Sequence, residues 1–142
     1  MRLTSFTDYA LRMLMYAAAR DDQLITIEET AERYHVSRAH LMKVANLLTR
    51  AEFLRAVRGR SGGLTLAKAP EKIVLGDVVR VTEPDFALVE CFGTGGNCLL
   101  TPSCRLRGVL GEALSAFVAT LDRYTLADLA LDPARFGLEK VP

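Results

Sequence analysis

The sequence predicts a mainly α-helical fold with one small β-hairpin. Apolar residues recur at helical spacing along most of the chain, and one such amphipathic segment near the C-terminus is long. Two short strand patterns flank a run that contains three glycines, which is typical of a hairpin. Half of the 142 residues are hydrophobic and a quarter are charged, so the composition indicates an ordered globular chain of one domain, or one small domain with an appendage.

The first predicted helix begins at Ser5 and ends near residues 21–22. The Ser5 hydroxyl can cap the helix, with Asp8 three residues later as the acid of a capping box. Asp8 can also pair with Arg12 one turn further along. The local pattern therefore predicts a structural role for Asp8.

Two shorter helices follow and form a helix-turn-helix pattern. Thr26 caps the first, which runs towards Tyr34, and Ser37 caps the second, from Arg38 to about Ala51. The polar side of this second helix carries the candidate groove contacts Ser37, Arg38, His40 and Lys43. In proteins that bind DNA with this motif, the second helix lies in the major groove.

A basic hairpin follows the helix pair. The segments 53–58 and 64–67 are predicted strands, and the glycines between them permit the positive φ angles of a tight turn. Residues 35–68 carry seven Lys or Arg side chains against the single acid Glu52, which is the charge pattern of a surface that meets phosphates. The candidate contacts at the tip are Arg58, Arg60 and Ser61. A hairpin placed after such a helix pair is a wing, so the sequence predicts a winged helix-turn-helix DNA-binding domain over residues 1–84.

The C-terminal half divides into a loop, a long helix and a tail. A short helix over 75–82 ends before Pro84, and a glycine-rich, cysteine-bearing loop spans 85–101. Thr101 and Pro102 then predict the start of a helix that runs to about Arg123, whose broad apolar face is too long for the first domain to cover. We therefore expect a dimerisation helix, with a short last helix capped by Thr125 and Asp128. This unit spans 102–131, and the tail 132–142 is weakly specified.

The three cysteines, Cys91, Cys98 and Cys104, all lie within fourteen residues. An odd number argues against a disulfide framework, and clustered soft thiolates are ligands for zinc, copper(I) or an iron–sulfur cluster. Structural zinc sites favour Cys-x-x-Cys pairs, whereas gaps of six and five residues suit a bulkier cluster. Zinc stays open on spacing alone, and so do three unligated thiols. Because neither histidine lies near this segment, a fourth ligand has to be another residue type, another chain or an exogenous molecule.

Other functional classes find little support in the sequence. It contains no nucleotide-binding motif and no catalytic dyad, so we expect no enzyme activity. Charges interrupt every apolar run, and the first residues have neither the apolar core nor the cleavage site of a signal peptide. The sequence therefore predicts a soluble, cytoplasmic chain.

Taken together, these residues resemble the iron–sulfur winged-helix transcriptional regulators of the IscR, NsrR and RirA type. The resemblance covers about residues 1–130. Four segments carry it: the opening 1–9, the wing 57–64, the three-cysteine segment that ends in Cys104, and the stretch 124–129. The opening and the 124–129 stretch are most similar to the nitric-oxide-sensing NsrR branch.

The resemblance implies a homodimeric repressor that binds palindromic operator DNA in its iron–sulfur form. Nitric oxide, as the effector, would nitrosylate the cluster and derepress nitric-oxide detoxification genes. In this branch Cys91, Cys98 and Cys104 are cluster ligands and the partner subunit's Asp8 is the fourth, whereas IscR-type proteins use a histidine at the position of Arg107. A 4Fe–4S cluster is favoured over 2Fe–2S.

Two alternatives accompany this prediction. The segment 77–87 also resembles the iron-sensing RirA regulators, so the chain is alternatively a sensor of iron or cluster status. In a different functional class, the cysteines bind zinc and stabilise a DNA-binding module without gas sensing.

Overall fold

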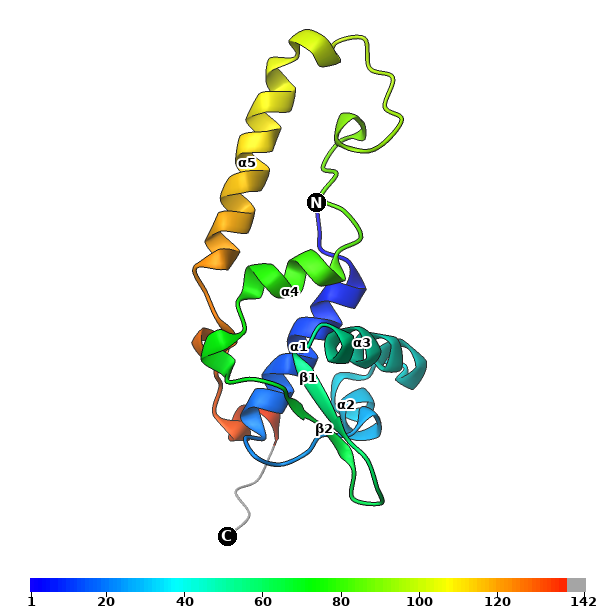
Figure 1. The fold of residues 1–142 in the computed structure, drawn as a ribbon, viewed down its shortest axis with the longest axis vertical. Helices are drawn as coiled ribbons and strands as arrows, with labels where there is room; N and C mark the ends of the chain where they lie inside the picture. Colours follow the sequence, from blue (N-terminus) through cyan, green and yellow to red (C-terminus); the bar gives the residue numbers. More distant parts are fainter. Residues whose placement is uncertain (138–142) are drawn as a thin grey trace.

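Helix α1 (Ser5–Ala19) lies at the centre of the computed structural model, in which residues 1–137 are described. Helices α3 and α4 pack against it, and the β-hairpin contacts it through its second strand (Figure 1). In chain order the other elements are α2 (Ile27–Tyr34), α3 (Arg38–Arg50), β1 (Leu54–Val57), β2 (Gly63–Leu66), α4 (Leu75–Thr82) and α5 (Arg105–Asp122). The architecture is therefore mainly helical with one hairpin, as predicted.

The helix-turn-helix pair is present with the predicted caps. The Thr26 hydroxyl oxygen accepts from the N–H of Glu29 at 3.1 Å, and the Ser37 hydroxyl oxygen accepts from the N–H of His40 at 3.1 Å. Between the helices, His35 takes the left-handed conformation (φ 54°, ψ 47°), which ends α2 and turns the chain towards α3. The predicted boundaries of both helices agree with the structure to within a residue or two.

The start of α1 corrects the expected capping box. Thr4, rather than Ser5, is the N-cap, and its hydroxyl oxygen accepts from the N–H of Thr7 at 3.3 Å. The side chain of Glu83, from the end of α4, accepts hydrogen bonds from the Thr4 backbone N–H (2.7 Å) and hydroxyl (3.1 Å). This contact joins residues 79 positions apart, so no local pattern signals it.

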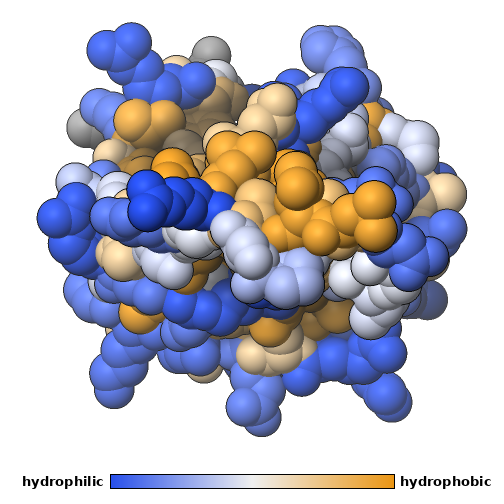
Figure 2. All heavy atoms as spheres, turned by 90° about the horizontal axis from the view of Figure 1, so that it is seen from above, coloured by the Kyte–Doolittle hydropathy of each residue, from blue (hydrophilic) through white to orange (hydrophobic). Residues whose placement is uncertain are grey.

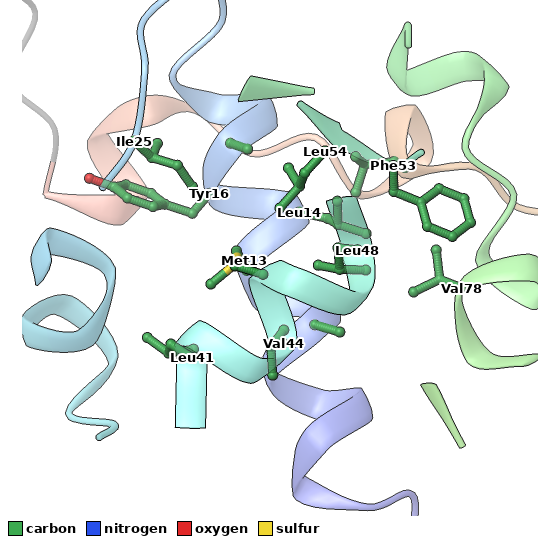
Figure 3. Close-up of a cluster of buried hydrophobic side chains, with 14 of the residues drawn as sticks. Met13, Leu14, Tyr16, Ile25, Leu41, Val44, Leu48, Phe53, Leu54 and Val78 are labelled. Carbon is green, nitrogen blue, oxygen red and sulfur yellow. The ribbon is translucent and has the colours of Figure 1, made fainter. Parts of the chain in front are cut away.

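The hydrophobic core is built around α1 (Figure 3). Figure 3 shows Met13 and Leu14 of α1 between the side chains of α3 and those of the first strand. Three further core residues, Ile25, Phe53 and Val78, come from connections and from α4. The wing also pairs with the α1–α2 connection through a bridge between Ile25 and Leu64, which attaches the wing to the segment that precedes the helix pair.

Helix α5 begins later than the sequence predicts. Residues Thr101–Ser103 form a separate 3-10 turn, and Cys104 is the N-cap of α5 with an extended backbone (φ −79°, ψ 111°). That extended residue separates the turn from the helix, so Thr101 does not cap α5 and Pro102 does not open it. The helix has 18 residues, about 27 Å at 1.5 Å per residue, and none of them is buried.

The C-terminal segment returns to the body. Thr125 and Asp128 form the predicted capping box, although the four residues that follow Thr125 form a 3-10 turn instead of an α-helix. A second turn, Pro133–Phe136, places the Phe136 ring 6.0 Å from that of Tyr16. Residues 133–136 of the predicted tail therefore contact the body, and the weak specification of the tail stays a prediction. Residues 138–142 of the predicted tail lie outside the described part of the chain.

Within residues 1–137, none of the helices has both the length and the apolar character needed to cross a membrane.

Candidate DNA interface and cysteine loop

The polar side of α3 is accessible at its N-terminal end. Arg38 forms an ion pair with Glu28 of α2 at 3.1 Å, and both side chains are mostly exposed. Because exposed pairs contribute little to stability, Arg38 can exchange this partner for a phosphate at small cost. Lys43 is exposed, and the Ser37 hydroxyl still has its hydrogen to donate after its oxygen has capped α3.

His40 lies on the side of α3 that faces α1. Its ring is 5.0 Å from the Tyr9 ring in an edge-on arrangement and 6.2 Å from the Phe6 ring. These contacts link the N-terminal turn of α3 to α1. A direct contact between His40 and DNA stays a prediction, and the structure adds a packing role for the same side chain.

The wing turns sharply between its two strands, which pair antiparallel with Leu54 opposite Leu66. Gly59 has φ 117°, and a Cβ on Gly62 would lie 2.3 Å from the carbonyl oxygen of Val57. Glycine is therefore required for the turn at both positions. The predicted tip residues Arg58, Arg60 and Ser61 are all exposed.

A groove of about 900 Å³ separates α3 from the wing. Its α3 wall includes Met42, Asn46 and Arg50, and Arg58 lies on the wing side. The three α3 residues are not among the groove contacts predicted from the sequence, although they follow Arg38 at steps of four and so share one helical face. Spacing from Arg38 was the signal that identifies them.

The cysteine loop carries three free thiols. Cys91 and Cys104 are half-buried and Cys98 is exposed. The loop doubles back on Cys91, because a Cβ on Gly96 would lie 2.9 Å from the carbonyl oxygen of Glu90 and 3.2 Å from the Cα of Cys91. Gly95, with φ 90°, permits this turn.

A hollow of about 500 Å³ adjoins Cys104 at the start of α5. Phe92 and Arg107 line it, and the Arg107 guanidinium lies 5.9 Å from the centre of the Phe92 ring. The hydroxyl oxygen of Thr101, which also lines the hollow, is buried without a hydrogen-bond partner among the described residues. The donor set fits a thiolate-ligated metal group, but within residues 1–137 no three His, Cys, Asp or Glu side chains converge on one point. Ligation by all three thiols therefore requires the cysteine segment to rearrange.

Asp8 forms an ion pair within α1. Its carboxylate is 2.8 Å from the nearer Nη of Arg12 and accepts from Arg12 Nε at 3.0 Å, with both side chains about half exposed. The pairing that the sequence predicts is thus observed. The Arg12 guanidinium also lies 6.0 Å from the ring centres of Tyr9 and Tyr34, so it joins the start of α1 to the end of α2.

Two tyrosines pack the helix-turn-helix pair onto α1. The Tyr16 hydroxyl donates to Glu29 at 2.9 Å, and the Tyr34 hydroxyl donates to the carbonyl oxygen of Arg12 at 2.9 Å. Burial raises the pKa of the Tyr34 phenol to about 12, and burial followed by the bond to Glu29 raises the pKa of Tyr16. Both phenols are therefore neutral donors throughout the physiological range.

Comparison with known proteins agrees with this geometry. The family model Rrf2, described as an iron-dependent transcriptional regulator, matches residues 3–132. The chain belongs to the Rrf2 family. The chain is 49% identical over 131 residues to the HTH-type transcriptional regulator NsrR of Bacillus subtilis, and 49% identical over 136 residues to that of Geobacillus kaustophilus. These matches cover 91% and 94% of the chain and 90% and 92% of the relatives.

Solved structures of the family have the same fold. CymR, the global cysteine regulator of B. subtilis, superposes with a TM-score of 0.74 at 23% identity, covering 92% of this chain and 96% of CymR. IscR of T. potens gives 0.73 at 23% identity, covering 91% of this chain and 85% of IscR. The predicted fold class and the resemblance to NsrR-type Rrf2 regulators are thereby confirmed. The relatives are named as regulators of transcription, in agreement with the expectation that this Rrf2 chain is not an enzyme.

Proposed function

We propose that the chain is a homodimeric transcriptional repressor that binds palindromic operator DNA in an iron–sulfur form and releases it in response to nitric oxide. The observation that carries the proposal is the position of the three free cysteines. They lie in the loop between the winged-helix body and the exposed helix α5, in a chain about half identical to NsrR regulators. DNA release would then derepress genes for nitric-oxide detoxification.

The cluster ligands in this proposal are Cys91, Cys98, Cys104 and the partner subunit's Asp8. Thiolate sulfur suits iron, whereas a carboxylate is a harder and weaker ligand among thiolates. When bound, the cluster supplies an iron whose carboxylate-ligated position nitric oxide can attack. A 4Fe–4S cluster is the form we propose.

The Asp8–Arg12 pair supports a link between ligation and DNA binding. When the Asp8 carboxylate binds iron in the other subunit, it loses its ion pair with Arg12. When it is released from the iron, the ion pair with Arg12 forms again. The neighbouring residue, Tyr9, contacts His40 in the first turn of α3. The adjacent residues Asp8 and Tyr9 thus connect the choice of partner at Asp8 to the position of the recognition helix α3. A coupling of about 1–3 kcal/mol between ligation and DNA binding changes the affinity for DNA about 5- to 150-fold.

The exposed face of α5 supports the homodimer. Leu106 and Val109 are each 61% exposed, and Phe117 is 36% exposed on the same side of the helix. Figure 2, a view from the end of the molecule that carries the cysteine loop and the start of α5, shows apolar side chains gathered near the centre of that end. A second copy of α5 is the occupant we propose, because it presents the same apolar face in return.

The primary test is the absorption spectrum of anaerobically purified protein during titration with nitric oxide, together with iron and sulfide analysis. We expect a broad sulfide-to-iron band that bleaches at a few equivalents, with parallel loss of binding to operator DNA. Zinc without acid-labile sulfide would instead identify the zinc-stabilised DNA-binding module.

A variant at Asp8 tests the fourth ligand. Asp8→Ala is expected to change the spectrum and the response to nitric oxide, while Asp22→Ala, an exposed acid beyond the end of α1, leaves both unchanged. An Asp8→Ala protein with the wild-type spectrum and wild-type sensitivity contradicts ligation from the partner subunit.

Sedimentation tests the dimer. Val109→Glu places a charge in the exposed apolar face and should yield monomers, whereas Ser115→Glu adds the same charge on the opposite side of α5 and should leave the dimer intact. Equal effects of the two variants would exclude this face as the interface.

Sensing of iron status is the second candidate function. The description of the matching family as iron-dependent favours it. A cluster that is indifferent to nitric oxide, combined with DNA binding that follows iron supply, would select this function over nitric-oxide sensing.

A further inference from the structure

The groove between α3 and the wing is a candidate binding site for one DNA strand. A helix in the major groove and a wing beside it must leave room between them for the intervening sugar–phosphate backbone. Here a groove of about 900 Å³ lies between the two elements, and the residues that line it include the apolar Ile27 and Leu64. These apolar lining residues suit contact with the carbon atoms of deoxyribose.

The two sides of this groove each carry an arginine that is free to meet phosphate. Arg50 is exposed at the end of α3, and Arg58 is exposed where β1 enters the turn. Neither side chain forms an ion pair with an acid among residues 1–137. Both cations are therefore available to bind consecutive phosphates of a strand lying between them.

The same α3 wall carries two exposed residues whose chemistry suits base edges. Asn46 is exposed one turn before Arg50, and no hydrogen bond of the described residues engages its carboxamide. Met42, one turn earlier, is 49% exposed although it is apolar. A carboxamide pairs with the N6 and N7 atoms of adenine in the major groove, and an apolar side chain packs on the methyl group of thymine.

We propose that Asn46 is a base-reading residue that binds adenine in the major groove, with Met42 packed on a nearby thymine methyl group. Arg50 and Arg58 bind the phosphates of the strand that lies in the groove. The Met42–Asn46 face therefore selects A·T pairs at the positions it contacts, and the two arginines contribute affinity without selecting sequence. This inference rests on the proposed DNA binding by the helix-turn-helix, and it holds whichever metal group the cysteines bind.

The test begins with selection of binding sites by the wild-type protein, purified anaerobically with its metal group and kept free of nitric oxide, from duplexes with a randomised central segment. The selected duplex is then altered one base pair at a time, and binding by Asn46→Ala is measured at fixed salt. We expect the variant to lose about 5- to 150-fold of discrimination at one A·T position and to keep the wild-type preference elsewhere. Asn46→Gln, which keeps the carboxamide on a longer side chain, should recover part of the loss.

Replacement of the read adenine by 7-deazaadenine isolates the contact. The missing N7 acceptor should weaken binding of the wild-type chain and leave binding of Asn46→Ala unchanged. Arg50→Ala should weaken binding to all duplexes alike and flatten the dependence of affinity on salt. The matched control Arg123→Ala removes an exposed arginine beyond the end of α5 and should change neither.

The outcomes separate this inference from DNA binding itself. A wild-type chain that selects no sequence overturns sequence-specific binding and the inference together. A chain that selects a site, but whose Asn46→Ala variant keeps every base preference, overturns only the role of Asn46. Loss of discrimination at G·C pairs instead of A·T pairs contradicts the proposed adenine contact.

Discussion

The body of the molecule, residues 1–82, and its arm, residues 85–122, differ in what they bury. The body contains nearly all of the hydrophobic core, arranged around α1. No residue of the arm is buried, although the arm includes an 18-residue helix with large apolar side chains. Apolar burial is the main favourable contribution to folding, so the body completes its fold within one chain. The arm has apolar surface that only another surface can cover.

This difference also separates the two activities proposed for the chain. The elements proposed to contact DNA, α3 and the wing, pack into the same core as α1. The cysteines lie outside this core, since Cys98 is exposed and Cys91 and Cys104 are half-buried. The elements proposed to contact DNA and the proposed metal ligands therefore lie in different regions of the chain.

The largest expected effect compares equivalent leucines in the two regions. Leu48→Ala in the core should lower the free energy of unfolding by about 2–5 kcal/mol. Leu106→Ala, at 61% exposure in the arm, should change it by less than about 0.5 kcal/mol when measured in the Val109→Glu background, where dimer contacts are removed. Denaturant unfolding followed by circular dichroism checks both values, and equal costs would contradict the division into body and arm.

A smaller effect is expected where the C-terminal turn contacts the body. Phe136→Ala removes a half-buried ring that packs on Tyr16, and should cost about 1–3 kcal/mol of unfolding free energy. Leu131→Ala, at an exposed position before that turn, is the control. Thermal unfolding of the two variants provides the measurement. If Phe136→Ala melts like the control, the turn does not stabilise the body.

The junction between the two regions should respond more weakly. Glu83→Ala removes both hydrogen bonds to Thr4 at the start of α1, and should lower the free energy of unfolding by about 1 kcal/mol. Glu71→Ala, an exposed acid in a 3-10 turn, should have no such effect. Denaturant titration with hydrogen exchange of the first turn of α1 tests this, because exchange there should accelerate only in Glu83→Ala.

The smallest effect concerns the contact of α4 with the end of α5. Arg80 donates to Asp122 at 2.6 Å and to Asp77 at 3.0 Å, and its bond lowers the pKa of Asp122. A lowered folded-state pKa gives stability that is present above the unfolded value and lost as the pH falls through the folded value. Asp122→Asn should therefore melt slightly below the wild type at neutral pH and together with it in strong acid. A difference that persists in acid would exclude the ion pair as its source.

Local patterns predicted the elements of the body well. Thr26 and Ser37 cap their helices as expected because a cap depends only on residues within three positions. The glycines that the turn requires predicted the wing. Helix α4 ends at Thr82, two residues before Pro84, as predicted. The same locality explains the Asp8–Arg12 pair, which one turn of helix brings together.

Long-range contacts were beyond those patterns. The bonds of Glu83 to the cap residue Thr4 and the contact of Phe136 with Tyr16 join residues far apart in the chain. His40 was predicted as a groove contact from its polarity, yet its ring packs on Tyr9. The four-residue spacing from Arg38 places Asn46 and Arg50 on one face of α3, but only the tertiary structure shows that this face lines a groove beside the wing.

By itself, the sequence determined the type and order of the elements, the family and the thiol donors, since these depend on side-chain chemistry and on spacing along the chain. Only the tertiary structure decided which residues share a surface. It aligned α3 with the wing across a groove, turned His40 towards α1, and left α5 without a covering surface. The physical reason is that such contacts join residues far apart in the chain, and their geometry is set by how the core around α1 packs.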